Sequence, residues 1–401
     1  MKKVQSRWKK SKFNRPYTQH NTIEWVQSGR GYFDRLEQLI EGAKYEIHIQ
    51  TYILQTDVTG NRIIEALMRA SLRQVKVFLL VDAYGSNNIS RQMAQRIRSS
   101  GIRFRRFGKL FNKGSFHFGR RMHHKVIVID GYTSIVGGMN IADHYGGTEN
   151  KPAWLDFAAI MEGEISRKLQ VVCRRRWIGW RFSLKNDQAL LKSQGLLPKT
   201  TELVKIRVRR NDFVQYKQEI TLGYREAIRR AERSILLVGG YFLPGGTTRR
   251  LLKNARSRGV KIDVLVSEKS DVRLLILARR YLYDWLIRNG IGVYEYKPSN
   301  VHGKVLIIDD HWTTIGSYDL NNLSAYSNIE LNVDVDHEPF SKNLSARIRK
   351  IMVEDCHQII AERPGRRFPA PQQLMLWISY RFVKTLFVLS LLLAGKKANE
   401  F

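Results

Sequence analysis

Apolar residues recur along the chain in two series of short strands that alternate with amphipathic helices. In the first series, the spacing predicts helix, strand, helix and strand at 36–44, 45–53, 61–72 and 75–81. In the second series, the same order of elements is expected at 220–231, 234–238, 249–257 and 260–266. The second half of the chain therefore repeats the first, which indicates a duplicated architecture.

Strands that alternate with short helices are typical of crossover units around a sheet. We therefore expect an α/β protein with two pseudo-repeated lobes packed face to face, each with a mostly parallel or mixed sheet flanked by helices. The stretch 183–201 loses strand periodicity and is expected to hold the boundary between the lobes. The expected division is a basic segment at 1–21, lobes at 22–195 and 196–363, and a tail at 364–401.

The tail contains a predominantly apolar stretch at 374–394 that includes Arg381 and Lys384. Its length is close to the ~20 residues that span a bilayer, but each cation would cost roughly 2.5–3.5 kcal/mol at the bilayer centre. The pattern favours a membrane-associated helix that lies in the interface, with both cations reaching toward lipid headgroups. A spanning helix, and a helix buried on the protein body or on a partner, remain as alternatives.

Composition narrows the class of protein. The chain has 401 residues, 43% of them hydrophobic, so it can bury a sizeable core and is not a disordered protein. Its formal net charge of +32 is spread along most of the chain. This excess implies a polyanionic partner, either nucleic acid or an anionic membrane, with an ordinary solvated basic surface as the alternative.

Two features bear on the cellular compartment. The basic N-terminal 19 residues lack the apolar stretch of a secretory signal, so the catalytic body is expected on the cytoplasmic side. Cys173 and Cys356 lie far apart and fit no metal-ligand spacing. Neither a disulfide framework nor a zinc site is therefore expected.

One pattern occurs once in each half: a His-x-Lys pair, then a run of apolar residues and an Asp. It is formed by His123, Lys125 and Asp130, and again by His302, Lys304 and Asp309. Because residues two apart on a strand share a face, the His and Lys of each pair project together from the start of a buried strand. One such match is compatible with an ordinary strand with polar edges, but two matches in corresponding places of a repeat are not easily dismissed.

This arrangement suits a phosphoester substrate and requires no metal or cofactor. Lys neutralises phosphate oxygens, and an imidazole attacks phosphorus or transfers a proton near neutral pH. A small-residue turn follows each motif, and Asn140 and Ser317 in these turns are candidate donors to the phosphate. Asp130 and Asp309 belong to the motif, but an Asp that ends a strand is commonly a turn residue, so a structural role is expected for them.

The paired motifs resemble those of the phospholipase D superfamily, and the resemblance covers about residues 22–360. Three stretches are similar to bacterial cardiolipin synthases, particularly of the B type: 120–125, 309–317 and 328–330. The resemblance implies a two-step displacement at one site between the lobes. His123 would form a phosphatidyl-histidine, while His302 would protonate the leaving alcohol and then activate a second alcohol.

The resemblance also implies a carboxylate behind each histidine, with Asp156 in that place in the first half and Glu330 in the second. One position departs from the family, which usually has Asn where this chain has Asp319. The carboxylate of Asp319 would point away from the phosphate, or Asn321 or Asn322 would replace the missing donor, or the second half would bind phosphate less well.

Three further histidines need an interpretation. His144, four residues after Asn140, is within reach of the cleft, although a lone loop histidine is more often unrelated to catalysis. His48 and His311 are interpreted as ordinary strand or turn residues.

The leading functional hypothesis is cardiolipin synthesis, in which a phosphatidyl group passes between two phosphatidylglycerol molecules and glycerol leaves. The expected partners are phosphatidylglycerol and the membrane surface, with the enzyme peripheral or monotopic on a bacterial cytoplasmic membrane. Phospholipase D hydrolysis or another headgroup exchange is the first alternative. A nuclease agrees with the charge but not with an apolar tail, and a non-catalytic scaffold ranks last because both motifs are intact.

Overall fold

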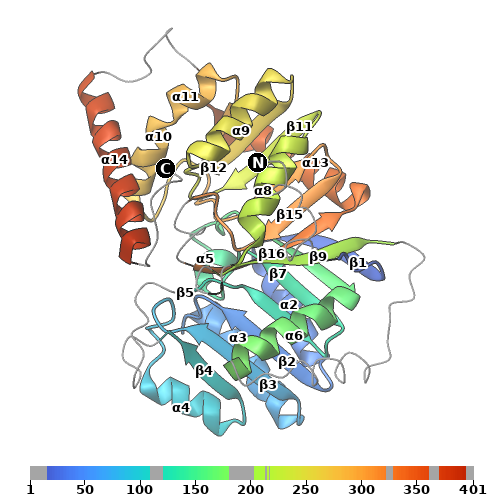
Figure 1. The fold of residues 1–401 in the computed structure, drawn as a ribbon. Coiled ribbons are helices and arrows are strands. Elements are labelled where there is room, and N and C mark those ends of the chain that lie inside the picture. The colour runs from blue at the N-terminus through green and yellow to red at the C-terminus, as the bar shows by residue number, and fades with distance from the viewer. Residues whose placement is uncertain are drawn as a thin grey trace.

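A computed structural model describes residues 16–108, 121–179, 203–212, 215, 217–321, 328–360 and 370–393. Two α/β lobes lie one against the other, and the last helix lies along the side of the second lobe (Figure 1). The predicted boundary at 183–201 lies outside the described residues. The division of the chain at 195 therefore stays a prediction.

The first lobe is built on a seven-stranded sheet with the order β1-β8-β7-β6-β2-β3-β4. Its strands are β1 Asn21–Gln27, β2 Glu46–Thr51, β3 Lys76–Asp82, β4 Arg103–Phe107, β6 Val126–Ile129, β7 Thr133–Gly137 and β8 Phe157–Gly163. Its helices are α2 Arg30–Glu41, α3 Val58–Leu72, α4 Arg91–Ser99, α5 Asp143–Gly146 and α6 Glu164–Ile178.

The second lobe is built on a ten-stranded sheet with the order β10-β9-β16-β15-β14-β11-β12-β13-β17, to which β5 is added beside β16. Its strands are β5 Arg121–Met122, β9 Lys205–Asp212, β10 Lys217–Gln218, β11 Ser234–Gly239, β12 Lys261–Ser267, β13 Gly292–Tyr296, β14 Lys304–Ile308, β15 Trp312–Gly316, β16 Asn328–Asp336 and β17 Cys356–Gln358. The helices are α8 Glu219–Arg230, α9 Gly246–Ser257, α10 Arg273–Tyr281, α11 Tyr283–Arg288, α13 Glu338–Glu354 and α14 Ala370–Leu393.

Both sheets are mixed, which confirms the second of the two expected sheet types. Parallel pairing joins β2, β3 and β4 in the first sheet and β11, β12 and β13 in the second. The motif strands instead pair antiparallel with both neighbours. The turn at 130–132 joins β6 directly to β7, and a connection this short permits only antiparallel pairing.

The predicted repeat is confirmed element by element, with one boundary that differs. Helix α2 begins at Arg30 rather than at 36, because Tyr32 and Phe33 are buried one helical turn before Leu36 and extend its apolar face. The helix also ends at Glu41, before Gly42. The remaining predicted helices and strands lie within three residues of their expected bounds.

The strands that carry the motifs are apolar on both faces. Ile127 and Ile129 of β6 join the core inside the first lobe, while Val126 and Val128 join a central core that contains residues of both lobes. Strand β14 shows the same alternation in the second lobe. The lobes therefore pack face to face, and a strand buried on both sides reads as a continuous apolar run.

Helix α14 packs on the second lobe beside α10 (Figure 1). Leu376 and Val383 are buried, and the ring of Tyr380 stacks on that of Tyr281 with centroids 4.9 Å apart. Within the described part of the chain, none of the helices combines the length and apolarity needed to cross a bilayer. One face of α14 is held by the protein body.

Candidate active site

The segment before each motif histidine pairs with the opposite lobe. Strand β5 runs parallel to β16 of the second lobe, and the His123 N–H donates to the carbonyl of Ile329 at 2.9 Å. Conversely, the N–H groups of His302 and Gly303 both donate to the carbonyl of Leu155 in the first lobe, at 2.8 and 3.0 Å. Each motif is thus fixed to the lobe that does not contain it, which brings both motifs to the seam between the lobes.

The side chain of His123 is held from the second lobe. Its Nδ1 lies 3.0 Å from each carboxylate oxygen of Glu330 and 3.2 Å from the carbonyl oxygen of Ser317. Glu330 is fully buried and accepts a further hydrogen bond of 2.5 Å from the Ser317 hydroxyl. Because Nδ1 is engaged in this way, Nε2 is the ring nitrogen left to face a substrate.

The side chain of His302 is held from the first lobe. Its Nδ1 lies 2.7 Å from Oδ2 of Asp156, a fully buried residue whose Oδ1 accepts from the N–H of Phe157 at 2.7 Å. The structure therefore brings both candidate carboxylates to the histidines. It corrects the half-by-half assignment, because each carboxylate supports the histidine of the other half.

The two pairs differ in their electrostatics. Burial, with the nearby cations Lys304 and Lys125, lowers the pKa of His302 well below its usual range, and burial raises the pKa of Asp156 to about 7. Burial also acts to raise the pKa of Glu330, but the charge and hydrogen bond of His123 outweigh it and hold this pKa below its ordinary value. Near neutral pH, Glu330 is an anion that stabilises an imidazolium beside it, whereas His302 is held in the neutral form.

The motif lysines are buried in equivalent positions. Each ammonium donates to the carbonyl of its own motif histidine, Lys125 to His123 at 2.9 Å and Lys304 to His302 at 2.5 Å. Burial lowers the pKa of Lys125 to about 7. Two buried ammonium groups at one seam concentrate positive charge there, which suits a phosphate anion.

Asp319 is the carboxylate partner of the second lysine. Its Oδ2 lies 3.4 Å from Nζ of Lys304, so the side chain does not point away from the site as one alternative required. The amide of Asn321 donates to the carbonyl of Tyr241 at 3.2 Å. Asn322, the other candidate replacement donor, lies outside the described residues.

Asn140 and Ser317 are both engaged by protein groups. The Asn140 amide donates to the Tyr145 hydroxyl at 2.7 Å, and its Oδ1 accepts from the N–H of Ile53 at 3.1 Å. The Ser317 hydroxyl donates to Glu330 and accepts from the N–H of Leu331 at 3.0 Å. These contacts hold the motif turns and the carboxylate in place, and direct phosphate binding by either residue stays a prediction.

Asp130 and Asp309 lie at the opposite ends of the motif strands from the lysines. The Asp130 carboxylate accepts from three successive backbone N–H groups at 44–46, each at 2.8 Å. Asp309 does the same for the N–H groups at 232–234, at 2.7 to 3.0 Å. At ~3.3 Å per residue, the strand between the lysine and this aspartate spans roughly 16 Å. These contacts agree with the structural role expected of both motif aspartates and place it at the starts of β2 and β11.

Two tyrosines that sequence reasoning missed line the site. The Tyr52 ring follows β2 and lies 5.0 Å from the ring of His123 and 5.3 Å from the Lys125 ammonium. Tyr241 follows β11, and the centroid of its ring lies 6.4 Å from that of His302 and 5.9 Å from Nζ of Lys304. The strands β2 and β11 are equivalent in the repeat, and each is followed within two residues by a tyrosine. This recurrence is the signal from which both residues could have been predicted.

His144 is linked to the active site by the aromatic rings that it packs against. Its ring centroid lies 4.2 Å from that of Trp154 and 4.5 Å from that of Tyr145. The Tyr145 hydroxyl in turn lies 3.4 Å from Nε2 of His302. Burial lowers the pKa of His144, which favours its neutral form in this aromatic wall.

The other histidines and the cysteines lie outside the site. His48 is buried in β2 and contacts Glu46 at 2.5 Å, while His311 is exposed and contacts Asp336 at 3.0 Å. Both cysteines have free thiols.

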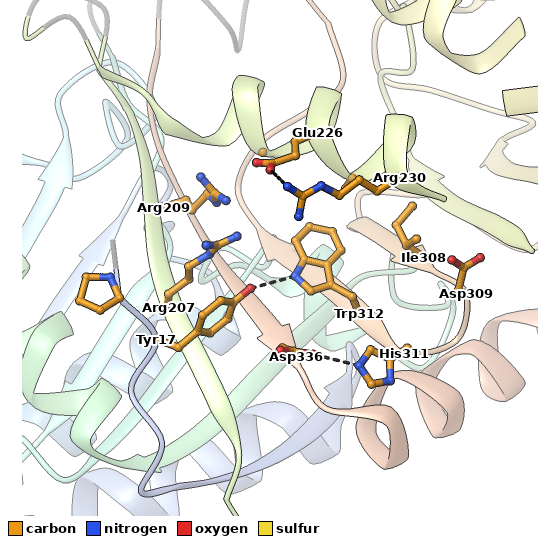
Figure 2. Close-up of a pocket in the computed structure, with 13 residues that line it drawn as sticks. Tyr17, Arg207, Arg209, Glu226, Arg230, Ile308, Asp309, His311, Trp312 and Asp336 are labelled. Atoms are coloured by element: carbon orange, nitrogen blue, oxygen red, sulfur yellow. Dashed lines mark hydrogen bonds and ion pairs between the residues drawn. The ribbon is translucent and has the colours of Figure 1, made fainter. Parts of the chain in front are cut away.

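A separate cleft of about 520 Å³ lies in the second lobe, between α8 and strands β9 and β15 (Figure 2). Its lining includes Ile308 at the end of β14, so it opens at the far end of the strand that begins with Lys304. Arginines in this cleft contact acids: Arg207 with Asp334 at 2.9 Å, and Arg230 with Glu226 at 2.7 Å. The cleft is therefore distinct from the histidine site.

A duplicated α/β fold with one His-x-Lys pair and one buried carboxylate from each half defines a phospholipase D-like protein. The family model described as cardiolipin synthase, PLD-like domain, matches residues 36–150 and 224–352, more than half of the chain. The chain belongs to this family. The enzyme class predicted from the sequence, a phosphatidyltransferase of the phospholipase D type, is thereby confirmed.

Curated relatives agree with this placement. The chain is 29% identical to "Cardiolipin synthase B" of Shigella flexneri and of Escherichia coli K12 over 352 residues, which covers 84% of this chain and 82% of each relative. It is 26% identical to "Cardiolipin synthase A" of Pseudomonas putida over 347 residues, 86% of this chain and 70% of that protein.

Solved structures agree on the fold. A phosphatidylserine synthase from Haemophilus influenzae superposes with a TM-score of 0.72 at 15% identity, covering 96% of this chain and 99% of that one. A polyphosphate kinase from Porphyromonas gingivalis reaches a TM-score of 0.54 at 18% identity, with 92% of this chain and 53% of that one covered.

Proposed function

We propose that the protein is a cardiolipin synthase, which transfers a phosphatidyl group from one phosphatidylglycerol to another and releases glycerol. The observation that carries the proposal is the reciprocal pairing of His123 with Glu330 and of His302 with Asp156, beside two buried lysines. Membership of the cardiolipin synthase family and the named relatives support the choice of substrate.

In the first step, Nε2 of His123 attacks the phosphorus of the donor lipid. A phosphorus–nitrogen bond forms, and the bond from phosphorus to the glycerol oxygen breaks. Glu330 stabilises the positive charge that develops on the His123 ring. His302 donates a proton to the leaving oxygen, and the negative phosphodiester beside Lys125 and Lys304 favours the protonated form of His302 that this requires.

In the second step, a hydroxyl of the second phosphatidylglycerol attacks the phosphatidyl-histidine. Its proton passes to His302, whose burial favours the neutral ring that can accept it. The phosphorus–nitrogen bond breaks, cardiolipin leaves, and His123 returns to its starting form. One imidazole thus serves as acid and then as base.

The exposed face of α14 is the proposed contact with the membrane. A stripe of half-exposed apolar side chains runs along it at four-residue spacing, formed by Leu374, Ile378, Phe382 and Leu386. Residues four apart lie on one face of a helix, opposite here to the buried Leu376 and Val383. Such a face, with the cations Arg381 and Lys384, suits a helix lying in the interface of an anionic bilayer.

Helix α10 connects the proposed membrane contact on α14 with the active site. Helix α10, on which α14 packs, begins two residues after Asp271, and Oδ1 of Asp271 accepts a hydrogen bond of 2.7 Å from the hydroxyl of Tyr241 beside His302. A membrane docked on α14 would therefore lie near the loop that borders the catalytic seam. We place the enzyme on a bacterial cytoplasmic membrane with its lobes on the cytoplasmic side.

The test is mass spectrometry of lipids after the purified full chain meets phosphatidylglycerol vesicles, with His123→Ala and His302→Ala alongside. Cardiolipin and free glycerol made by the unmodified protein alone would support the proposal. Phosphatidic acid as the main product would replace it with hydrolysis. If no histidine-dependent lipid product formed, the donor would be wrong, and nucleic-acid substrates would be tested next.

A further inference from the structure

Asp319 presents an unfilled acceptor to the catalytic seam. The residue is buried, and its Oδ2 faces Nζ of Lys304 at 3.4 Å. Its Oδ1 is shielded from solvent and has no hydrogen-bond partner within the described part of the chain. A buried carboxylate oxygen without a donor costs free energy unless a ligand supplies one, so this atom is a candidate acceptor for a ligand that enters the seam beside Lys304.

The equivalent residue in the first half, Asn140, has no unpaired acceptor of this kind. Asn140 donates to the Tyr145 hydroxyl and accepts from the N–H of Ile53, so both ends of its amide are used. The two halves therefore differ in what they offer a substrate. Among the described residues, the polar groups of Asn140 are all paired, whereas Oδ1 of Asp319 is an acceptor without a donor.

The charges around Asp319 limit what this donor can be. A phosphodiester has no proton to donate, and its oxygens repel a carboxylate. It carries one negative charge, which the ammonium groups of Lys125 and Lys304 attract. The remaining donors on the lipid headgroup are its hydroxyl groups.

We propose that Oδ1 of Asp319 accepts a hydrogen bond from a free hydroxyl of the substrate's polyol headgroup, on the carbon next to the one that carries the reacting oxygen. This inference rests on the proposed phosphatidyl transfer. Water and simple alcohols lack this second hydroxyl, so the molecule that attacks phosphorus cannot also donate to Oδ1. The site therefore selects a polyol acceptor over water, which favours transfer over hydrolysis.

The experiment offers competing acceptors to the full chain on phosphatidylglycerol vesicles. Deuterated glycerol and 1-propanol are added in equal amounts, and labelled phosphatidylglycerol, phosphatidylpropanol and phosphatidic acid are counted by mass spectrometry. We expect the unmodified protein to prefer glycerol by about ten-fold or more, since a hydrogen bond to a charged group is worth at least that factor.

Two variants remove the acceptor in stages. Asp319→Ala should bring the preference for glycerol close to one and raise the share of phosphatidic acid. Asp319→Asn should lower the preference by about three-fold or more, because a neutral amide oxygen accepts more weakly than a carboxylate. Asp319→Asn decides the question if the alanine variant does not fold.

The matched control is Asp310→Asn, which makes the same change of charge in the turn after β14, away from Lys304. Its acceptor preference should equal that of the unmodified protein. An unchanged preference in the Asp319 variants would overturn the inference, as would an equal change in the control. If the unmodified protein transferred to neither alcohol, the proposed function itself would fail, which is a distinguishable result.

Discussion

Nδ1 of His302 lies 2.7 Å from Oδ2 of Asp156, although 146 positions separate the two residues in the chain. His123 and Glu330 show the same relationship across 207 positions, at 3.0 Å. Each histidine thus depends on a carboxylate from the other lobe. Neither lobe holds a complete half-site by itself, so the catalytic geometry depends on how the lobes pack.

Removing either carboxylate should reduce turnover while the protein stays folded. We expect Glu330→Gln and Asp156→Asn each to lower kcat by about 10²- to 10⁴-fold, because the imidazole loses its orientation and its stabilising charge. In a double variant, Glu330→Gln should add little to the loss caused by His123→Ala, since the two residues act as one unit. Additive losses in cardiolipin formation would contradict the cross-lobe pairing as the functional unit.

The activity should depend on pH through Lys125. Its pKa is lowered to about 7, so in the free enzyme the ammonium is charged below this pH and loses its charge above it. Phosphodiester binding, measured as kcat/KM, should therefore fall as the pH rises through that value. Lys125→Arg keeps its charge and should move the falling limb to higher pH even if the rate drops. If the falling limb of the pH profile stayed at the same pH in this variant, the pH dependence would belong to another group.

Asp130 and Asp309 should affect stability rather than chemistry. Replacing either by Ala leaves three backbone N–H groups without their acceptor. We expect each variant to lose about 1–3 kcal/mol of the free energy of unfolding, measured by urea denaturation, with near-normal turnover per folded molecule. A variant that unfolds at the usual urea concentration yet is inactive would restore a catalytic role.

The apolar stripe on α14 can be tested by flotation with vesicles. Ile378→Asp combined with Phe382→Asp should lower binding to phosphatidylglycerol vesicles by about ten-fold or more, because two half-exposed apolar side chains no longer enter the interface. Val353→Asp on α13 is the matched control, since Val353 is 84% exposed but lies on another helix. Equal losses in both variants would mean that α14 is not the docking face.

Local patterns predicted much of the fold. The repeated strands and helices follow from the period of apolar residues, and the motif strands follow from runs that are buried on both faces. The direction in which neighbouring strands pair could not be predicted from these patterns. Local periodicity is the same in parallel and antiparallel strands, and it is the short turns at 130–132 and 309–311 that require the antiparallel arrangement.

The chemistry of the site is legible in the chain because spacing on a strand fixes which side chains project together, as for His123 with Lys125 and His302 with Lys304. Which carboxylate supports which histidine is not legible, because Asp156 and Glu330 reach the histidines from the opposite lobe, through the pairing of β5 with β16 and of Leu155 with Val301. Long-range pairing depends on the packing of two sheets rather than on neighbours in the chain. For that reason the sequence supplied the reacting groups, and the folded seam supplied their orientation, their charge states and the open acceptor on Asp319.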